Sequence, residues 1–177
     1  MEIKIGDKLD NITLPSLNDS IFELKSTKGK KILLTFYRFA ACPMCNLRIN
    51  ELKKNYTSFG SNFMHVAIFN SELDNLKRFT KKHDAPFPIL ADKNFKYFDK
   101  YSVKRSLLRF IWSQVIRINR QIKGMVKGYI PWAIKGYITT LPVDILIDEH
   151  GVVQDVKYAK DLGDHISIEA INQFSSN

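Results

Sequence analysis

The chain contains two cysteines, Cys42 and Cys45, in the sequence Cys-Pro-Met-Cys. Pro43 suits the first position of a helix, because the N–H that proline lacks would have no partner there. Cys42 is then expected at the N-cap and Cys45 in the first turn. Free N–H groups and the positive end of the helix dipole favour a thiolate at this place. One helical turn also brings the second sulfur within reach of a disulfide bond. The spacing therefore predicts a redox-active dithiol.

Two other interpretations of the cysteine pair compete with redox chemistry. A zinc site needs two further ligands at a suitable spacing, but the sequence has no third cysteine and its four histidines stand far apart. Two buried cysteines can also behave as small hydrophobic residues, although this pair falls where a strand ends and a helix begins. We therefore expect no metal and no other cofactor.

The elements that must position the cysteines follow from the hydrophobic pattern. Strands are expected at residues 30–37, 62–70, 143–151 and 152–160, the last two forming a hairpin, and helices at residues 43–59, 71–83 and 167–174. Strands that alternate with helices predict a parallel start to the sheet, and the hairpin adds antiparallel strands. His65 falls on an apolar strand and is expected in the core or at its edge. The fold class is α/β.

The net charge of +9 is concentrated in one part of the 177-residue chain. Between Ser102 and Val143 there are eight basic residues and no acidic ones, which leaves 19 basic against 18 acidic residues elsewhere. The basic residues are Lys104, Arg105, Arg109, Arg117, Arg120, Lys123, Lys127 and Lys135. The N-terminus lacks the features of a secretory signal, and no apolar run is long enough to span a bilayer. A cytoplasmic location is expected, where a disulfide is transient rather than structural.

This basic segment also carries apolar residues at helical spacing, so residues Lys104–Lys123 are expected to form one amphipathic helix. The apolar residues are Leu107, Leu108, Ile111, Val115, Ile118 and Ile122. Such a helix could form a lid over the cysteines, a partner or homodimer surface, or a contact with an anionic membrane. It could also be a solvated helix packed on the domain. No nucleic-acid reading motif accompanies the charge, so no specific nucleic acid is expected.

Several stretches resemble a known family. The sequences KILLTFYRFAACPMC and PFPILADKNFKYFDKYSV resemble the alkyl hydroperoxide reductase/thiol-specific antioxidant group, the peroxiredoxins. FYRFAACPMCNLRINEL together with LPVDILIDEHGVVQDVKYAKDLGDH resembles the peroxiredoxin-like redoxins that carry C-x-x-C. The resemblance implies a thioredoxin-like fold with a central mixed sheet flanked by helices. The length favours one domain over residues 1–177. The resemblance does not cover the basic segment, which is expected to be a helical insertion at about residues 102–140.

The resemblance also implies roles for single residues. It places a cis peptide bond before Pro142, beside the cysteines, where an extended substrate is accepted. The peroxiredoxin pattern Pro-x-x-x-Thr/Ser-x-x-Cys puts the peroxide-attacking cysteine at Cys45, the hydroxyl residue at Cys42 and the proline at Arg38. A thiol thus replaces the hydroxyl, and the family's second arginine is missing from the place near Pro142. These departures disfavour peroxidase activity.

The thioredoxin-like assignment is preferred. Cys42, as the more exposed sulfur, attacks a disulfide, and the more buried Cys45 resolves the product. Arg38 either supplies positive charge to the thiolate or is a surface residue. The expected function is a thiol–disulfide oxidoreductase with a peroxiredoxin-like antioxidant role, acting on a disulfide-containing protein or a peroxide with a thiol electron donor. One alternative is a peroxidase with Cys45 peroxidatic and Cys42 resolving. Another is a redox-sensing docking module that uses the basic segment.

The loop from Tyr158 to His165 offers polar groups for proton transfer, namely Asp161, Asp164 or His165. The plainer interpretation is that Asp164 or a neighbour caps the last helix.

Overall fold

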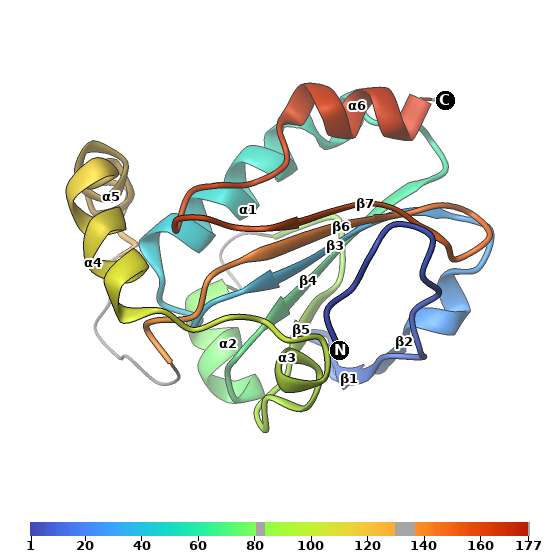
Figure 1. Cartoon of the computed structure of the whole chain (residues 1–177), viewed down its shortest axis with the longest axis horizontal. Coiled ribbons are helices and arrows are strands. Elements are labelled where there is room, and N and C mark those ends of the chain that lie inside the picture. The colour runs from blue at the N-terminus through green and yellow to red at the C-terminus, as the bar shows by residue number, and fades with distance from the viewer. Residues whose placement is uncertain (81–83, 130–136, 177) are drawn as a thin grey trace.

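The centre of the computed structural model, which describes residues 1–80, 84–129 and 137–176, is one five-stranded sheet (Figure 1). Its strand order is β5-β4-β3-β6-β7. The strands are β3 (Lys31–Tyr37), β4 (Phe63–Phe69), β5 (Ile89–Ala91), β6 (Val143–Ile147) and β7 (Val153–Tyr158). The pairs β3–β4 and β4–β5 are parallel, whereas β3–β6 and β6–β7 are antiparallel. The parallel start and the late hairpin are therefore confirmed.

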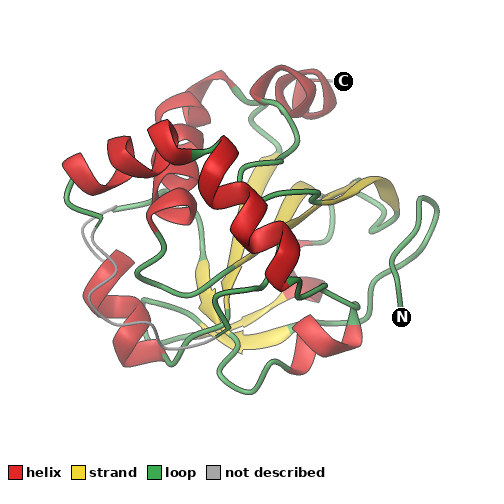
Figure 2. Ribbon diagram, turned by 60° about the vertical axis from the view of Figure 1, so that its left-hand side comes forward, coloured by secondary structure: helices red, strands yellow, loops and turns green. Residues whose placement is uncertain are grey.

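Helices lie on both sides of this sheet, as Figure 2 shows. The helices are α1 (Pro43–Asn55), α2 (Leu73–Thr80), α3 (Lys96–Lys100), α4 (Leu107–Ile116), α5 (Ile118–Val126) and α6 (Ile168–Ser176). Short elements complete the chain: β1 (Thr13–Pro15), β2 (Ile21–Glu23) and the 3-10 turns η1 (Leu24–Thr27) and η2 (Tyr56–Ser58). α1 and α6 cover one face, and α3 lies on the other with the N-terminal segment (Figure 1). Residues 81–83, expected at the end of α2, lie outside the described residues.

The core has two parts because side chains alternate between the faces of a strand. In β3, Leu33 and Tyr37 join the apolar cluster beneath α1 and α6, whereas Leu34 and Phe36 join the cluster on the α3 side. A strand covered on both faces is apolar along most of its length. β3 is therefore anchored on both sides just before the chain reaches the cysteines.

The basic segment forms two helices, so the expectation of one helix over Lys104–Lys123 is wrong. α4 ends where Arg117 leaves the helical conformation, with φ −112° and ψ 17°, and α5 begins at the next residue. The turn brings the Arg117 guanidinium to Asp161 and lets α5 pack back onto α1. Residues 130–136 of the expected insertion lie outside the described part of the chain.

The two ends of the basic segment run side by side. Arg105 and Thr140 form an antiparallel bridge, and the Leu141 N–H donates to the Lys104 carbonyl at 2.9 Å. The chain therefore already runs in an extended, paired conformation as it approaches Pro142. All peptide bonds in the described residues are trans, the bond before Pro142 included, so the expected cis bond is wrong.

Candidate active site

The loop after β3 delivers both cysteines to the first turn of α1. Cys42 is the N-cap, with φ −65° and ψ 117°, and its sulfur accepts the backbone N–H of Cys45 at 3.3 Å. The Cys45 thiol donates to the Cys42 sulfur at 2.7 Å. Pro43 occupies the start of the helix, as expected from the missing N–H. The predicted local geometry of the dithiol is confirmed.

The expected exposure of Cys42 is wrong. Its exposed fraction is 0% and that of Cys45 is 4%, so neither sulfur is open to solvent. Residues distant in the sequence cover this end of α1, since Gly124 of α5 lies directly on Pro43 and Phe110 of α4 lies by Arg38. A reaction partner has to reach a sulfur that is buried in this conformation.

Arg38 lies beneath the cover, although the end of a strand often carries a surface arginine. It is 4% exposed, its Nη1 lies 3.5 Å from the Cys42 sulfur, and its Nη2 donates to the Ile138 carbonyl at 2.7 Å. The guanidinium also lies 5.2 Å from the ring centroid of Phe39 and 5.5 Å from that of Phe110 in α4. A fixed positive charge thus stands beside the first cysteine.

The pKa values of the two thiols are shifted in opposite directions. Burial disfavours both thiolates, but for Cys42 the hydrogen bond from the Cys45 thiol and the charge of Arg38 outweigh burial and lower its pKa to about 6. Burial raises the pKa of Cys45, and its hydrogen bond to Cys42 and the charge there raise it further. Near pH 7 the thiolate therefore resides on Cys42, and the proton of the pair on Cys45.

The α4–α5 pair (residues 107–126) closes over the start of α1. A Cβ atom at Gly124 would lie 3.0 Å from the Pro43 Cβ and 3.2 Å from the Leu47 Cδ1, so a larger residue would push the helices apart. Nη2 of Arg120 reaches Oε2 of Glu51 at 3.3 Å. Figure 1 shows the same arrangement, with α4 and α5 beside the end of α1 that carries the cysteines.

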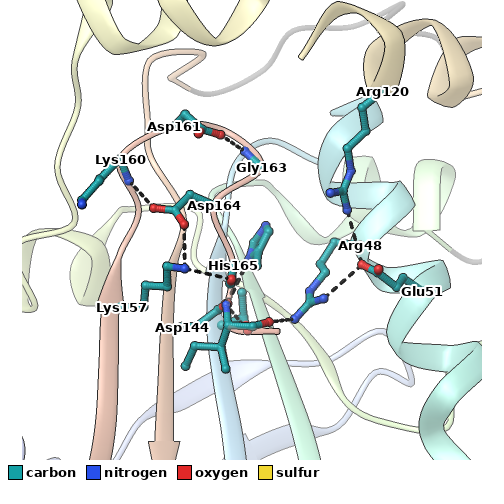
Figure 3. Close-up of polar contacts among 12 residues, drawn as sticks. Arg48, Glu51, Arg120, Asp144, Lys157, Lys160, Asp161, Gly163, Asp164 and His165 are labelled. Atoms are coloured by element: carbon teal, nitrogen blue, oxygen red, sulfur yellow. Dashed lines mark hydrogen bonds and ion pairs between the residues drawn. The ribbon is translucent and has the colours of Figure 1, made fainter. Parts of the chain in front are cut away.

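The loop before α6 contacts this cover through Asp161, whereas Asp164 pairs within the loop and with β7. Asp161 accepts Nε and Nη2 of Arg117 at 3.1 and 3.0 Å. Asp164 pairs with Lys157 at 2.6 Å and accepts the Lys160 N–H at 2.9 Å (Figure 3). In the described part of the chain neither carboxylate forms a hydrogen bond with a cysteine.

The cap of α6 is Ser167, whose Oγ accepts the N–H of Ala170 at 3.1 Å. Asp164 is therefore not the cap of this helix, and the residue that caps it lies just after the Tyr158–His165 loop.

A buried ionic cluster below α1 was missed by the sequence analysis (Figure 3). Asp144 of β6 accepts the Ile166 N–H at 2.8 Å and the Thr35 hydroxyl at 2.9 Å, and Nδ1 of His165 lies 3.0 Å from its Oδ2. Burial alone would raise the pKa of Asp144, but His165 and Arg48 hold it well below its usual range. A lone aspartate inside the apolar run Val143–Ile147 was the available signal.

Arg48 joins this cluster to the cover. Its Nη2 donates to the Ile166 carbonyl at 2.5 Å, and its Nη1 lies 3.0 Å from the same Glu51 oxygen that Arg120 reaches. Of the three polar residues proposed from the loop, only His165 thus enters the interior beneath the cysteine helix.

His65 is buried, as its place on an apolar strand predicted. Its pKa is lowered to about 3, chiefly by burial, so the ring is neutral. Neither ring nitrogen has a hydrogen-bond partner among the described residues, and the same is true of the nearby Tyr37 hydroxyl. His65 is therefore a core residue.

Pro142 stands at the end of the sheet where the cysteine loop begins, because the next residue, Val143, pairs with Phe36. Its carbonyl accepts the Ala159 N–H at 3.1 Å. In the described ranges no group of three or more His, Cys, Asp or Glu side chains could hold a metal ion. No helix in those ranges is long and apolar enough to cross a membrane.

Comparisons with known proteins agree with this geometry. The chain is 28% identical over 137 residues to the thiol-disulfide oxidoreductase ResA of Bacillus cereus, covering 73% of this chain and 78% of that protein. It is 26% identical over 159 residues to the putative peroxiredoxin bcp of Coxiella burnetii, covering 88% and 89%. The crystal structure of peroxidoxin BcpB from Mycobacterium tuberculosis has the same fold, with a TM-score of 0.70 at 17% identity, covering 99% and 98%.

The likeness to the BcpB structure confirms the expected thioredoxin-like fold, a mixed sheet flanked by helices. The model of the AhpC/TSA family matches residues 5–156, which is most of the sequence. The chain therefore belongs to the AhpC/TSA family.

Proposed function

We propose that this protein is a thiol–disulfide oxidoreductase that cycles Cys42 and Cys45 between dithiol and disulfide. The observation that carries the proposal is the Cys42 sulfur, which receives hydrogen bonds from the Cys45 N–H and thiol and lies 3.5 Å from an Arg38 nitrogen. These contacts favour a thiolate at neutral pH. The second sulfur, 2.7 Å away, is already close to the bonding distance of about 2.05 Å.

The reaction transfers two electrons from the cysteine pair to a substrate disulfide. The Cys42 thiolate attacks one substrate sulfur, forms a mixed disulfide and releases the other substrate sulfur as a thiolate. Cys45 then loses its proton and attacks the Cys42 sulfur, which releases the second substrate thiol. The substrate is now reduced and the protein holds a Cys42–Cys45 disulfide. A thiol donor returns the two electrons and restores the starting state.

The surrounding residues take supporting roles in this proposal. Arg38 stabilises the Cys42 thiolate, and the backbone around Pro142 receives the extended substrate. The Leu141 N–H beside it is already bonded to Lys104, so the substrate competes with the basic segment for this edge. His165 remains the candidate for proton transfer to or from Cys45, whereas we assign Asp161 to holding the cover in place and Asp164 to ordering its own loop.

The substrate, the electron donor, the location and the role of the basic segment are also part of this proposal. We propose a disulfide-containing protein as the oxidised substrate, a small thiol or dithiol protein as donor, and a cytoplasmic location. The basic segment at about residues 102–140 is an insertion into a single domain, and in this proposal it acts as a lid over the cysteines. The lid opens for the substrate.

Peroxide reduction is the second candidate, with Cys45 peroxidatic and Cys42 resolving. It is favoured by the relatives named peroxiredoxin and by the match of Cys45 to the attacking position of the family pattern. It is disfavoured by the raised pKa of Cys45, since the thiol rather than the thiolate then prevails at neutral pH.

Single-turnover reactions of Cys42→Ser and Cys45→Ser distinguish the candidates. Each pre-reduced variant is mixed with an aromatic disulfide such as 5,5′-dithiobis(2-nitrobenzoate) and, separately, with hydrogen peroxide. We expect Cys45→Ser to release one aromatic thiolate and to retain the other as a mixed disulfide, whereas Cys42→Ser reacts slowly. Near-ultraviolet circular dichroism checks that both variants are folded.

Two results would contradict this assignment. Rapid peroxide consumption that persists in Cys42→Ser but disappears in Cys45→Ser would establish the peroxidase. If neither reaction depended on either cysteine, the enzymatic proposal would fail and the redox-sensing docking module would fail with it.

A further inference from the structure

The α4–α5 pair is amphipathic in the reverse sense, with small and polar residues turned toward the protein and apolar residues turned outward. On its inner side Ser113 is fully buried and accepts the Leu162 N–H at 3.1 Å, and Gly124 lies against α1. Arg117 and Arg120 on the same side form ion pairs with the domain. Hydrophobic burial therefore does not explain the apolar stripe of this segment.

The outer side carries the stripe instead. In α4 the exposed apolar residues recur at the spacing of one helix face, and Leu108 and Trp112 are 81% and 61% exposed. In α5, Val126 is 82% exposed. The outer face of the pair consists of Leu108, Ile111, Trp112, Val115, Ile118, Ile122, Met125 and Val126. A contiguous exposed apolar face of this kind marks an interaction surface.

Cations accompany this outer face. Arg109, Lys123 and Lys127 are exposed, and none of them forms an ion pair within the described ranges. No aspartate or glutamate occurs between Ser102 and Val143 to offset them. The face thus offers both apolar side chains and uncompensated positive charge to whatever covers it.

We propose that the outer face of the α4–α5 pair docks on the surface of an anionic lipid bilayer. Leucine, isoleucine and tryptophan side chains enter the boundary between headgroups and acyl chains, while Arg109, Lys123 and Lys127 contact anionic headgroups. With ten and nine residues the two helices are too short to span a bilayer, so they lie along its surface. The domain carrying the cysteines then sits on the membrane with α1 directly behind the docked helices.

Charge decides between a bilayer and a second copy of this chain. Pairing two copies through this face would bring the three free cations of each against those of the other, without an acidic residue of the segment between them. An anionic bilayer neutralises these cations and also receives the apolar side chains. Nucleic acid would neutralise the charge but leave the isoleucine, leucine and valine side chains without an apolar partner.

Vesicle binding tests the proposal with the intact chain. Lipid vesicles of phosphatidylcholine alone are compared with vesicles containing 30% phosphatidylglycerol by co-sedimentation. In a Trp132→Phe background Trp112 is the remaining tryptophan, and its emission reports entry into the bilayer boundary. We expect binding and a blue shift with the anionic vesicles, little of either with the zwitterionic ones, and weaker binding in 1 M salt, where the screening length is about 3 Å.

Two sets of variants identify the face. Neutralising Arg109, Lys123 and Lys127 to Gln is expected to weaken binding about 100-fold, at about 5-fold per cation. Replacing Leu108 with Ser removes an apolar contact and is expected to weaken binding without changing the net charge. The matched controls are Lys4, Lys28 and Lys30 to Gln, which remove the same charge elsewhere, and Ile21→Ser at another exposed apolar position. These controls are expected to bind like the wild type.

Other outcomes would overturn the proposal. They include no binding to anionic vesicles, equal binding to both vesicle types, or an equal loss of binding in the control variants. A dimer in sedimentation velocity that Leu108→Ser dissociates would assign the face to a second copy. Tighter binding of a single-stranded or duplex oligonucleotide through the same three cations would assign it to nucleic acid.

Discussion

Two sets of polar contacts flank the cysteine helix, and they differ in burial; Figure 3 draws the inner set, around Asp144 and His165. Below α1, Asp144 and His165 are almost inaccessible to solvent and are supported by Arg48. Beside α1, Arg117 pairs with Asp161, and the arginine side chain is 37% exposed. Both sets join α1 or its cover to the loop before α6. They differ in how much free energy of unfolding their loss should cost.

A buried charge that loses its partner stays unpaired, because water cannot reach it. When an exposed ion pair breaks, water solvates both charges, so little free energy is lost. The Asp144 cluster therefore fixes the sheet and the loop that follows β7. The outer pairs contribute about 0.2–1 kcal/mol each, so the lid can open at low cost while the rest of the domain stays folded. In the proposed lid mechanism, access to Cys42 is therefore expected to depend on the weaker set.

The largest test of the contrast removes one carboxylate from each set. We expect Asp144→Ala to lower the free energy of unfolding by about 3–5 kcal/mol, because it leaves buried charge without a partner. Asp161→Ala should lower it by less, because its partner Arg117 is 37% exposed and stays solvated when the carboxylate is removed. Urea denaturation measures both. Equal effects of the two substitutions would remove the distinction drawn from burial.

The same aspartate predicts an acid dependence of stability. Its pKa in the folded protein lies below the value of about 3.9 expected in the unfolded chain. Its contribution is therefore complete above about pH 4 and is lost as the pH falls through the folded-state pKa. Asp144→Asn should flatten the fall in stability between about pH 4 and pH 2, measured by urea denaturation at each pH.

A second comparison concerns apolar packing on the two helical regions. Leu52 of α1 is fully buried, so Leu52→Ala should cost about 2–5 kcal/mol through the lost burial and the cavity it leaves. Val115 of α4 faces outward, and Val115→Ala should change the stability by less than about 0.5 kcal/mol. A large loss for Val115→Ala in thermal unfolding would mean that the outer face is packed in solution.

The pH dependence of Cys42 tests the charge held under the lid. Alkylation by iodoacetamide should rise as the pH increases through about 6, because only the thiolate reacts and its pKa is lowered. Arg38→Met should move this midpoint upward, toward the value of about 8.5 of an ordinary thiol. Arg109→Met, which removes an exposed arginine of the same segment, is the control. An unchanged midpoint in Arg38→Met would separate the arginine from the thiolate.

The smallest expected effect is on the rate of Cys42 alkylation when the lid loses one ion pair. Arg117→Gln removes the pair with Asp161 and should speed the alkylation of Cys42 at pH 8 by about 1.5- to 5-fold, without shifting the urea midpoint beyond its error. Arg105→Gln is the matched control, because its pair with Asp99 lies away from α1. Equal acceleration in both variants would show that any loss of charge in the segment has the same effect.

Local signals made the dithiol predictable. Pro43 and the apolar run before it fix where the strand stops and the helix starts, and these depend on neighbours in the sequence. The order of strands and helices was also available, because each has its own period. The family resemblance supplied the fold, and Asp144 could have been singled out as a charged residue within an apolar strand.

Tertiary contacts account for what was missed. The helical spacing of apolar residues continues past Arg117, so nothing local marks the break that its contact with Asp161 accompanies. Periodicity also identifies a stripe without saying whether it faces the core or the solvent. The start of α1, next to Cys42, is packed against Gly124, a residue about eighty positions away. The conformation before Pro142 is accompanied by pairing with Lys104.

The bridge between Arg105 and Thr140 holds together the two ends of the basic segment that contains α4 and α5. Because its entry and exit are already hydrogen-bonded neighbours, the cost of closing the loop between them grows only slowly with its length. We therefore expect that a short turn grafted between these two positions would leave β6 in place.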